Sequence, residues 1–526
     1  MLQSLSGYGG LVTAPHHLAA RAGLSVIEDG GSAVEACVAT AAALAAAYPH
    51  MTGIGGDGFW LVAEPDGRTW AIDACGRAAQ AATPARYEGL AAVPWRGPLA
   101  ACTVAGTVSG WAAALAASGS TLPLSRLLGG AIRLAEEGVA VTRGHAAIAE
   151  AKGAELRAQP GAYAAAFEPA GRPLGAGERL RQPTLAATLR RLAADGLDGF
   201  YRGALAADIA ADLAALGSPL SADDLAAHRA ETPAPLSVRI EGATLYNTAP
   251  PTQGLASLII LALFDRLRAE DIDGFDHVHG LVEATKQAFL VRDAEIGCPS
   301  GMTLDPQALL DDAAALGALA AAIDPARALP WPQPPASGDT TWFGAADARG
   351  QVVSCIQSTY FEFGSGVVLP KTGIAWQNRG AAFRLDGRGP CPLRPGTKPF
   401  HTLNPALARF ADGRVMAYGT MGGEGQPQTQ AALFTRYARF GADLQAAITA
   451  PRWLLGRTWG EASTSLKLED RFAPALYEAL RAAGHDIELL PAYTATMGHA
   501  GALVRHPDGR MEGATDPRSD GMVAAC

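Results

Sequence analysis

The sequence predicts an α+β protein, in which helices dominate before about residue 338 and short strands dominate after it. Apolar residues recur at helical spacing through residues 123–216 and again through residues 255–288. Residues 329–337 (LPWPQPPAS) are rich in proline and lack periodicity, which is typical of an exposed connector. Beyond this connector, β-branched or aromatic runs separated by Gly and Asp turns predict strands at residues 341–346, 352–358 and 373–376.

Two helices are expected near the start of the chain. Residues 17–30 have a helical pattern that ends at a pair of glycines. Residues 32–48 predict a second helix, because Ser32 can cap it and Glu35, three residues on, completes a capping box. Its apolar part, residues 38–48, is too short to span a bilayer. We therefore expect a buried core helix there and no membrane partner.

A glycine-rich turn and a hairpin follow these helices. Residues 52–59 read TGIGGDGF, and the runs at 60–63 and 69–72 predict a hairpin around the Pro-Asp-Gly turn at 65–67. The GIGGDG segment resembles a nucleotide-binding loop, but it follows a helix rather than a strand, so the context of a dinucleotide fold is missing. Residues 347–350 (DARG) predict a second hairpin turn.

The composition favours a folded protein with a large core. Of the 526 residues, 49 % are hydrophobic and 18 % are charged, which excludes a disordered chain. The formal net charge is −9 and no Lys/Arg-rich run stands out, so we expect no nucleic-acid partner. No metal is expected, because His277 and His279 lie near Asp276 without a third ligand at suitable spacing.

The cysteines and the N-terminus favour a reducing compartment. None of the seven cysteines has CxxC spacing, and a scattered, odd set is typical of free thiols: Cys37, Cys75, Cys102, Cys298, Cys355, Cys391 and Cys526. The first ten residues have neither the basic nor the apolar segment of a signal peptide. A cytoplasmic location is therefore expected.

Candidate chemistry lies where the connector meets the later strands, at residues 338–341 (GDTT). A threonine hydroxyl is a weak nucleophile until a base removes its proton. If the bond between Asp339 and Thr340 is cut, the freed α-amine of Thr340 supplies that base within the same residue. An α-amine titrates near about pH 8 in model peptides, which suits work at neutral pH. Two threonines at a strand start also fit ordinary β-propensity, so the motif alone leaves both interpretations open.

A second glycine-rich segment, residues 419–425 (GTMGGEG), follows an apolar strand predicted at 415–418. Adjacent glycines let backbone N–H groups point at one spot, which suits an oxyanion that develops during attack on a carbonyl. A tight turn or a phosphate-binding nest explains the glycines equally well when they are considered alone.

Taken together and in order, these segments resemble the gamma-glutamyltransferase family of N-terminal-nucleophile (Ntn) hydrolases over nearly the whole chain. Eight segments carry the resemblance: 12–36, 52–59, 105–110 (AGTVSG), 250–254 (PPTQG), 283–293 (EATKQAFLVRD), 338–341, 419–423 and 513–519 (GATDPRS). The resemblance implies an αββα four-layer sandwich built from two subunits of one self-cleaved precursor. Residues 1–339 would form the large, helix-rich subunit with part of the central sheets, and residues 340–526 the small subunit.

The same resemblance implies roles for individual residues. Thr340 would be the nucleophile, Gly422 and Gly423 the oxyanion donors, and Ser358 a hydroxyl that hydrogen-bonds the free α-amine. A small-molecule substrate is implied, without a cofactor. Related proteins often pair as dimers of processed halves, so a homodimer is an expected assembly.

The chain departs from the glutamyl-transferring members at two substrate-binding positions. Cys75 replaces their arginine for the substrate α-carboxylate, and Ala382 replaces their aspartate for the α-ammonium. Burying either charge of an amino-acid head group without a partner is costly, so a γ-glutamyl substrate is not expected. Arg77, two residues beyond Cys75, is an alternative partner for a carboxylate.

Other substitutions suggest a different substrate. Tyr360 stands where the family has an asparagine, and His401 and Thr402 replace a serine pair. Arg379, whose fork suits a carboxylate, lies just before the missing aspartate. A pocket made smaller by Tyr360 and cationic by Arg379 and His401 would suit a small acid amide without an amino group. The alternatives are an ion pair of Arg379 with an acid such as Asp386 and a packed or capping role for His401.

This pattern is similar to the oxamate amidohydrolase branch of the family, in segments such as TTWFG, WQNRGAAF, KPFHTLNPA and GTMGGEGQPQTQ. The implied reaction converts oxamate and water to oxalate and ammonia, within nitrogen salvage from purine or ureide breakdown. Two alternatives stay open. One is a γ-glutamyl hydrolase or transferase, or an acylase for β-lactam side chains, on the same fold. The other is an uncleaved, catalytically silent binding scaffold.

Overall fold

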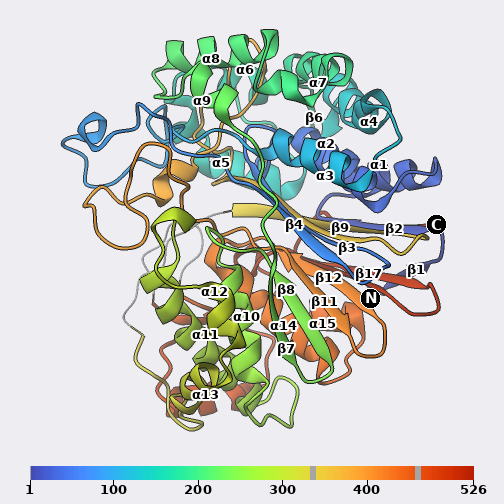
Figure 1. Ribbon diagram of the computed structural model, residues 1–526, viewed down its shortest axis with the longest axis vertical. Helices are drawn as coiled ribbons and strands as arrows, with labels where there is room; N and C mark the ends of the chain where they lie inside the picture. The colour runs from blue at the N-terminus through green and yellow to red at the C-terminus, as the bar shows by residue number, and fades with distance from the viewer. Residues whose placement is uncertain (1, 332–338, 457–463) are drawn as a thin grey trace.

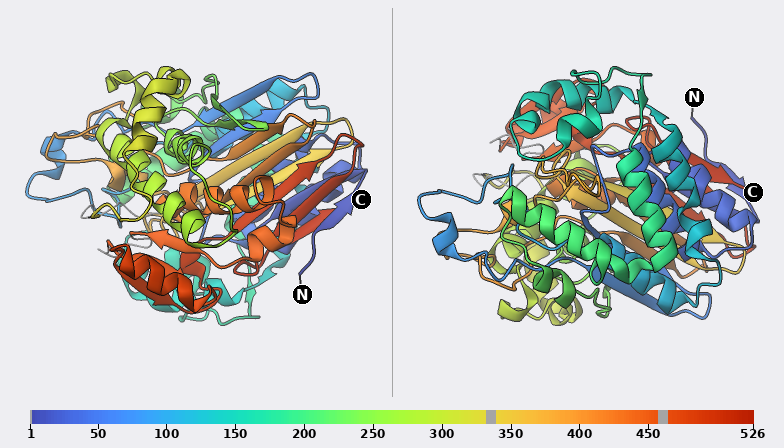
Figure 2. Two further views of the ribbon diagram at one scale, coloured as in Figure 1. Left: turned by 90° about the horizontal axis from the view of Figure 1, so that it is seen from below. Right: turned by 90° about the horizontal axis from the view of Figure 1, so that it is seen from above.

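The computed structural model describes residues 2–331, 339–456 and 464–526, with Asp339 described through its backbone alone. Two β-sheets lie face to face at the centre, and helices cover the outer face of each sheet (Figure 1). The views from below and from above in Figure 2 show a helical layer on both sides of the strands. The expected α+β class and the αββα four-layer sandwich are confirmed.

The six-stranded sheet lies nearer the top of Figure 1 and holds the predicted nucleophile. Its strands, in spatial order, are β18 (Met522–Ala525), β2 (Gly10–Ala14), β9 (Asp339–Asp347), β10 (Val352–Tyr360), β3 (Asp57–Ala63) and β4 (Thr69–Ala74). All neighbouring strands in this sheet are antiparallel.

The seven-stranded sheet lies below it and holds the strand that leads into the second glycine-rich segment. In spatial order its strands are β1 (Leu5–Gly7), β17 (Met511–Thr515), β16 (Ala500–Arg505), β12 (Val415–Thr420), β11 (Ala406–Phe410), β8 (Ala243–Asn247) and β7 (Leu236–Ile240). Two small sheets lie outside this sandwich: β5 (Val139–Ala140) with β6 (Arg179–Leu180), and β13 (Trp453–Leu455), β14 (Leu466–Glu469) and β15 (Ile487–Leu490).

The helices divide between the two outer layers. The upper layer contains α1 (His17–Glu28), α2 (Ala33–Ala47), α3 (Thr107–Ser118), α4 (Leu124–Glu137), α5 (Arg143–Arg157), α6 (Tyr163–Phe167), α7 (Pro183–Asp195), α8 (Ala204–Leu216) and α9 (Ala222–Ala227). The lower layer contains α10 (Gly254–Phe264), α11 (Phe275–Glu295), α12 (Pro306–Asp311), α13 (Ala313–Ala321), α14 (Gln426–Ala438), α15 (Leu444–Thr449) and α16 (Pro474–Ala482).

Three apolar layers hold the sandwich together. One lies between the upper helices and the six-stranded sheet, and one between the seven-stranded sheet and the lower helices. The third fills the space between the sheets and includes Leu11, Phe59, Trp342, Leu407 and Leu503. Burial of these side chains in continuous layers is the main favourable contribution to the fold.

Helix α2 runs through the centre of the upper layer, and every one of its residues is buried. The predicted capping box is present, because Ser32 Oγ accepts the Glu35 N–H and the Glu35 carboxylate accepts the Ser32 N–H. This confirms the expected core helix. Among the described helices, none combines the length and the apolar character needed to cross a bilayer.

Most of the other predicted elements are also confirmed. The hairpin of β3 and β4 turns at Gly67, the turn at 347–350 joins β9 to β10, and all seven cysteines are free thiols. The predicted strand at residues 373–376 is wrong. Ala375 and Trp376 make only isolated bridges, to Val368 and Gly55, because this segment crosses a loop region instead of joining a sheet. Of the predicted connector, residues 332–338 lie outside the described residues.

Each of the two large sheets combines strands from both sides of Thr340. In the six-stranded sheet β2, β3 and β4 precede it, and β9, β10 and β18 contain or follow it. In the seven-stranded sheet β1, β7 and β8 precede it, and the other four strands follow. The segments before and after Thr340 therefore share one folded unit.

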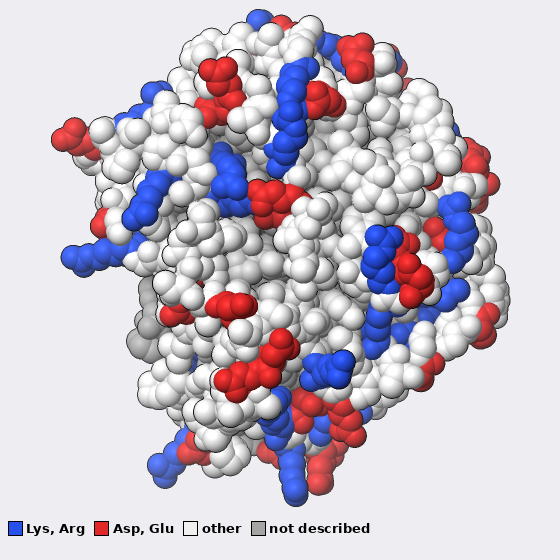
Figure 3. Space-filling model, in the orientation of Figure 1, with Lys and Arg blue, Asp and Glu red and all other residues white. Residues whose placement is uncertain are grey.

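On the face shown in Figure 3, acidic and basic side chains are interspersed, and the basic ones do not gather into a continuous patch.

Candidate active site

Thr340 lies one residue inside β9, beside the irregular end of the β9–β10 ladder. Gln357 pairs with Thr341 and Tyr360 pairs with Asp339, so Ser358 and Thr359 share the position opposite Thr340. This extra residue is a β-bulge, a feature that re-aims side chains and is common beside active sites. Ser358 Oγ accepts the Tyr360 N–H at 2.8 Å, which orients the bulge. The Thr340 side chain is fully buried.

Thr340 also contacts the second glycine-rich segment. The Gln426 side-chain amide nitrogen lies 3.4 Å from Thr340 Oγ1, a long hydrogen bond. Gln426 is the first residue of α14, and Gly422 and Gly423 precede it by four and three residues. The structure therefore brings the predicted nucleophile and the predicted oxyanion turn together across the two sheets.

The oxyanion turn needs glycine. Gly422 and Gly423 have φ angles of 120° and 53°, in the region that other residues adopt only with strain. Among the described residues, neither glycine N–H donates a hydrogen bond to a protein acceptor. The turn leads directly into the N-terminus of α14, whose dipole favours negative charge. Free N–H groups and a helix N-terminus together suit a developing oxyanion.

A buried polar network holds this turn in place. Gln253 Nε2 donates to the Gly423 carbonyl at 2.8 Å and to the Thr402 carbonyl at 2.7 Å. Arg292 in turn donates to Gln253 Oε1 and to the Glu424 carboxylate, at 3.1 and 2.7 Å. Fully paired networks of this kind rigidify a site, which keeps the glycine N–H groups aimed in one direction.

Arg379 is the buried cation of the site. Its side chain is only 1 % exposed, and one terminal nitrogen, NH1, donates to Thr402 Oγ1 at 3.3 Å. Its Nε and its other terminal nitrogen have no hydrogen-bond partner among the described residues. Burial lowers the pKa of the guanidinium, although arginine stays charged at neutral pH. Two unpaired donors on a buried cation mark a place for an anion.

Tyr360 forms one wall around this cation. The Arg379 guanidinium lies 3.6 Å from the centroid of the Tyr360 ring, a close cation–π contact. Tyr360 has a φ of 82°, which is unusual for a residue with a bulky side chain. Strained backbone of this kind clusters at functional sites, where the surrounding structure enforces it. Here it places the ring against Arg379, one register position from Thr340.

Asp57 is a buried carboxylate that connects several residues of the site by hydrogen bonds. The sequence analysis did not predict it. Its Oδ1 accepts the Gly76 and Gly106 N–H groups and the Gln377 side-chain amide, each at 3.1 Å. Its Oδ2 lies 3.1 Å from His401 Nε2. Burial raises the pKa of Asp57 to about 7, although the positive charge of Arg379 opposes this shift. The sequence feature that could have pointed to Asp57 is its position as the only acidic residue of the glycine-rich segment TGIGGDGF.

His401 joins the pocket as a neutral side chain. Its Nε2 is bound to Asp57, and its Nδ1 accepts the Leu403 N–H at 3.4 Å. Burial, aided by Arg379 and Lys398, lowers the pKa of His401 well below its usual value. The expectation that His401 adds positive charge is therefore wrong, because the ring is fully buried and burial disfavours the charged form.

Cys75 lies beside this pair, with its thiol, the Asp57 carboxylate and the His401 ring nitrogen within 4.8 Å of one another. Burial raises the pKa of the thiol well above its usual value, and Asp57 and Asp73 add to the shift. Cys75 is therefore an uncharged thiol beside Asp57 and His401 at neutral pH.

The structure separates the two arginines proposed for the substrate acid. Arg77 lies at the surface, where it binds the Glu231 carboxylate at 2.8 Å and the Gly396 carbonyl at 3.1 Å. Arg379 is not paired with Asp386 either, because Arg384 binds that carboxylate at 2.5 Å. Of these two arginines, only Arg379 combines burial with unpaired donors.

Among the described residues, two groups of side chains have the composition of metal ligands, but their surroundings disfavour a cation. Asp57, Cys75 and His401 lie close to the Arg379 guanidinium. His279, Glu283 and His485 form the other group, in which His279 and His485 are hydrogen-bonded at 2.9 Å. Lys286 places its ammonium 2.6 Å from Glu283. A positive charge at this distance opposes binding of a second cation.

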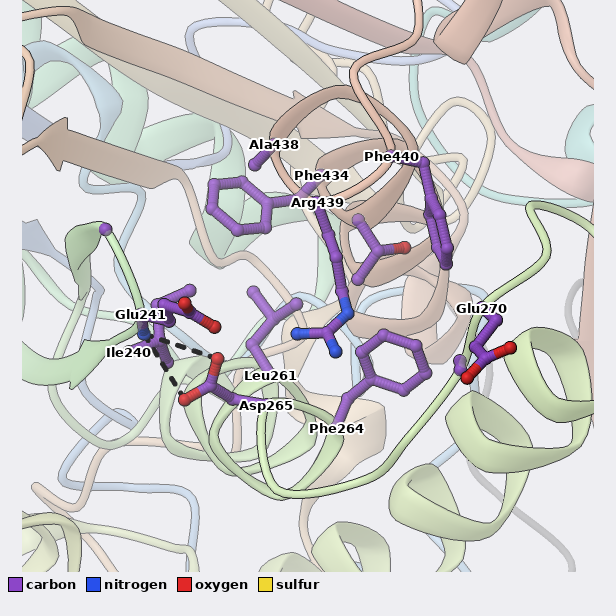
Figure 4. Close-up of a pocket in the computed structure, with 13 residues that line it drawn as sticks. Ile240, Glu241, Leu261, Phe264, Asp265, Glu270, Phe434, Ala438, Arg439 and Phe440 are labelled. Carbon is purple, nitrogen blue, oxygen red and sulfur yellow. Dashed lines mark hydrogen bonds between the residues drawn. The ribbon is translucent and has the colours of Figure 1, made fainter.

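A large surface pocket lies away from this site. It has a volume of about 520 Å³ and is lined by residues of β7, α10 and α14 and the loops beside them. Figure 4 shows Arg439 pointing into it beside Phe264, with Asp265 accepting the backbone N–H of Glu241. None of the predicted catalytic or substrate-binding residues lines this pocket.

Comparisons with known proteins agree with this geometry. The sequence profile described as gamma-glutamyltranspeptidase matches residues 19–526. The chain is 56 % identical to the oxamate amidohydrolase proenzyme of Klebsiella pneumoniae over 519 residues, 98 % of each chain. It is 39 % identical to the glutathione hydrolase-like YwrD proenzyme of Bacillus subtilis over 99 % of each chain. It superposes on the crystal structure of cephalosporin acylase from Bacillus halodurans with a TM-score of 0.92 and 33 % identity, over 100 % of this chain and 97 % of the other. The chain therefore belongs to the gamma-glutamyltranspeptidase family.

Proposed function

We propose that the protein hydrolyses the amide of a small acid, with oxamate as substrate and oxalate and ammonia as products. The observation that carries this proposal is the buried Arg379, which has two unpaired nitrogen donors and packs on Tyr360, the register partner of Asp339 beside Thr340. Oxamate has a carboxylate for Arg379 and an adjacent amide for Thr340. The likeness to the oxamate amidohydrolase proenzyme of Klebsiella pneumoniae supports the same substrate.

The proposed reaction begins with self-cleavage between Asp339 and Thr340. Thr340 Oγ1 attacks the Asp339 carbonyl carbon, and the resulting ester is hydrolysed by water. This step divides the chain into residues 1–339 and 340–526 and frees the α-amine of Thr340. The strands on both sides of the cut share two sheets, so the two parts would stay associated. Ser358 lies in the bulge opposite Thr340, and we assign its hydroxyl the hydrogen bond to the new α-amine.

Turnover then uses the same threonine. The α-amine takes the proton of Thr340 Oγ1, which attacks the amide carbon of the substrate. The Gly422 and Gly423 N–H groups stabilise the tetrahedral oxyanion. The α-ammonium returns the proton to the departing nitrogen, and ammonia leaves. Water then attacks the oxalyl ester, oxalate is released and Thr340 is restored, so no cofactor is required.

The pocket geometry favours this substrate over a γ-glutamyl compound. An amino-acid head group requires an anionic partner for its ammonium, and Ala382 supplies none. The Asp57 carboxylate is already bound to Gly76, Gly106, Gln377 and His401. The acylase alternative needs room for a bulky acyl group, and the close packing of Arg379 on Tyr360, 3.6 Å from the ring centroid, argues against it.

The wider setting follows from the same resemblance. We place the reaction in nitrogen salvage from purine or ureide breakdown, in the cytoplasm, by a protein of two processed subunits. A homodimer of these processed molecules is the assembly to test, by light scattering on the purified enzyme.

A denaturing gel with intact mass measurement tests the proposal first. Fragments of about 35 and 19 kDa are expected, by proportion from 54.0 kDa, with Thr340 at the new N-terminus. The cut protein should release ammonia from oxamate. A persistent 54.0 kDa chain with no activity would support the silent-scaffold alternative instead.

Substitution of the nucleophile provides the matched control. Thr340→Ala removes the hydroxyl and should leave one uncut, inactive chain. Thr340→Ser keeps a hydroxyl at the same position and should still be cut, at a reduced rate. A cut and active Thr340→Ala protein would contradict the assignment of the nucleophile.

A further inference from the structure

Gln426 has an unusual side chain in this site. It is fully buried, and its amide nitrogen contacts Thr340 Oγ1 at 3.4 Å. Its amide oxygen, Oε1, has no hydrogen-bond partner among the described residues. A buried amide oxygen without a donor costs free energy, so such groups are rare in folded proteins and call for an explanation.

Neighbouring glutamines on the same helix show what a structural role looks like. Gln428 Nε2 donates to the Leu455 carbonyl, and Gln428 Oε1 accepts the Leu455 N–H at 2.8 Å. Gln430 likewise donates to the Asn404 carbonyl and accepts from Ser257 Oγ. In both residues the amide is paired at both ends. Gln426 alone among these three has its nitrogen on the nucleophile and its oxygen unpaired.

We propose that Gln426 is a specificity-determining residue, whose Oε1 accepts a hydrogen bond from the N–H of the substrate's primary amide. This inference rests on the proposed amide hydrolysis and deepens it. When Thr340 Oγ1 bonds to the amide carbon, the leaving nitrogen is attached to that same carbon. Oε1 and Nε2 are likewise attached to one carbon of Gln426. A side chain whose Nε2 already touches Oγ1 therefore has its Oε1 within reach of the leaving nitrogen.

The chemistry of the leaving group strengthens this contact during the reaction. The nitrogen receives a proton from the Thr340 α-ammonium as the C–N bond breaks, so it acquires positive charge. A hydrogen bond from a charged donor is stronger than one from a neutral donor. The contact with Oε1 would therefore be stronger in the transition state than in the bound substrate, which is the condition for accelerating the chemical step.

An amide and an ester of the same acid separate this role from a structural one. Oxamate and monomethyl oxalate carry the same carboxylate for Arg379, but only oxamate has N–H groups on its leaving atom. We would measure kcat/KM for both compounds in the self-cleaved wild type and in Gln426→Leu. The variant loses the Nε2 contact for both compounds and the Oε1 contact for the amide alone. The ratio of amide to ester kcat/KM is expected to fall about tenfold.

Gln426→Glu is the conservative rescue, because it keeps an acceptor oxygen. Its absolute rates should fall, since it adds negative charge near the oxyanion, but its amide-to-ester ratio should stay within about threefold of wild type. Gln428→Leu is the matched structural control, and its ratio should not change. An unchanged ratio in Gln426→Leu would overturn the inference. So would failure of both Gln426 variants to self-cleave, because the inference gives Gln426 no part in processing.

These outcomes are distinct from failure of the proposed function. A wild-type protein that is cut but releases no ammonia from oxamate would refute the proposed substrate. An active wild type whose amide-to-ester ratio is unaffected by Gln426→Leu would refute the role of Gln426 alone.

Discussion

A buried guanidinium normally has an acceptor for each of its N–H groups, because unpaired charge is costly in an interior of low dielectric. Arg379 departs from this rule, with Thr402 and the Tyr360 ring as its partners and two nitrogens left over. Asp57 is close enough to influence its charge, but that carboxylate is already shared among backbone N–H groups, Gln377 and His401. At the residue scale, the unpaired donors of this buried cation are therefore the feature on which the proposed anion site rests.

Removal of Arg379 should separate charged from neutral substrates. Arg379→Ala is expected to lower kcat/KM for oxamate by about 100-fold, mainly through KM, because hydrogen bonds to charged groups contribute about 1.5–3 kcal/mol. Oxamide, which has a second amide in place of the carboxylate, should lose less than about fivefold by the same argument. Steady-state ammonia release from both compounds gives the comparison.

Arg77→Ala is the control for this experiment, since Arg77 is a surface arginine bound to Glu231. Its kinetics should match wild type. Equal losses on oxamate and oxamide in Arg379→Ala would show that Arg379 supports the fold of the pocket and does not bind the substrate acid.

At the scale of elements, a residue that caps a helix can also contact residues far away in the sequence. The capping box of α2 illustrates this. Besides the Ser32 N–H, the Glu35 carboxylate accepts hydrogen bonds from Ser120 Oγ and from the N–H groups of Thr121 and Leu122, at 2.6–2.9 Å. These three donors lie in the connection between α3 and α4. One glutamate therefore caps a helix and also fixes a loop of the upper layer.

Two substitutions in the uncut Thr340→Ala background should distinguish these roles. Ser32→Ala removes one cap hydrogen bond and should lower the free energy of unfolding by about 1 kcal/mol. Glu35→Ala removes the acceptor of three partly buried donors of the α3–α4 connection and should cost about 1–2 kcal/mol more. Denaturant titration followed by circular dichroism measures both. Equal losses would mean that Glu35 acts through the helix cap alone.

At the scale of the whole molecule, several buried histidines make the fold sensitive to acid. Burial lowers the pKa of His145 and of His499 to about 4 and that of His16 to about 3, and it also lowers the pKa of His50. The His50 and His145 rings lie 4.8 Å apart. In the unfolded chain these side chains take up protons below about pH 6.5, whereas in the folded protein they stay neutral.

Stability should therefore fall as the pH decreases from about 6.5 to about 4. Each histidine with a folded pKa of about 4 contributes a loss of about 3 kcal/mol over this window. Asp57 acts in the opposite direction, because its raised pKa stabilises the fold as the pH falls below about 7. Four buried histidines oppose this one carboxyl group, so a fall in pH from about 6.5 to about 4 should lower the free energy of unfolding. Thermal unfolding of the Thr340→Ala chain at several pH values measures this dependence.

His145→Phe tests the cause of this acid sensitivity. The phenylalanine ring fills the same apolar position beside Phe363 and has no proton to gain. The variant should lose less stability than the parent chain between pH 6.5 and pH 4. An identical pH dependence in both chains would assign the effect to other groups, such as the carboxylates.

The sequence by itself determined the elements that depend on neighbouring residues. The helices with clear periodicity, the capping box at Ser32, the hairpin turns and the glycine-rich turns are local features, because caps and turns are stabilised by residues a few positions apart. Thr340, Gly422, Gly423 and Arg379 could be proposed because short segments around them resemble or depart from those of the gamma-glutamyltransferase family. The strand predicted at residues 373–376 failed, because a strand also requires a neighbour to pair with, and this segment has none in either large sheet.

Only the tertiary structure decided which of these residues meet and in what state. It placed Gln426 on Thr340, bound Asp57 to His401 and showed Arg379 as the buried arginine and Arg77 as the surface one. It also made His401 neutral, which no local pattern could reveal. Hydrogen-bond partners and pKa values depend on burial and on side chains hundreds of residues away in the chain. For that reason the sequence could name the residues of the site, whereas the fold determined their partners and charges.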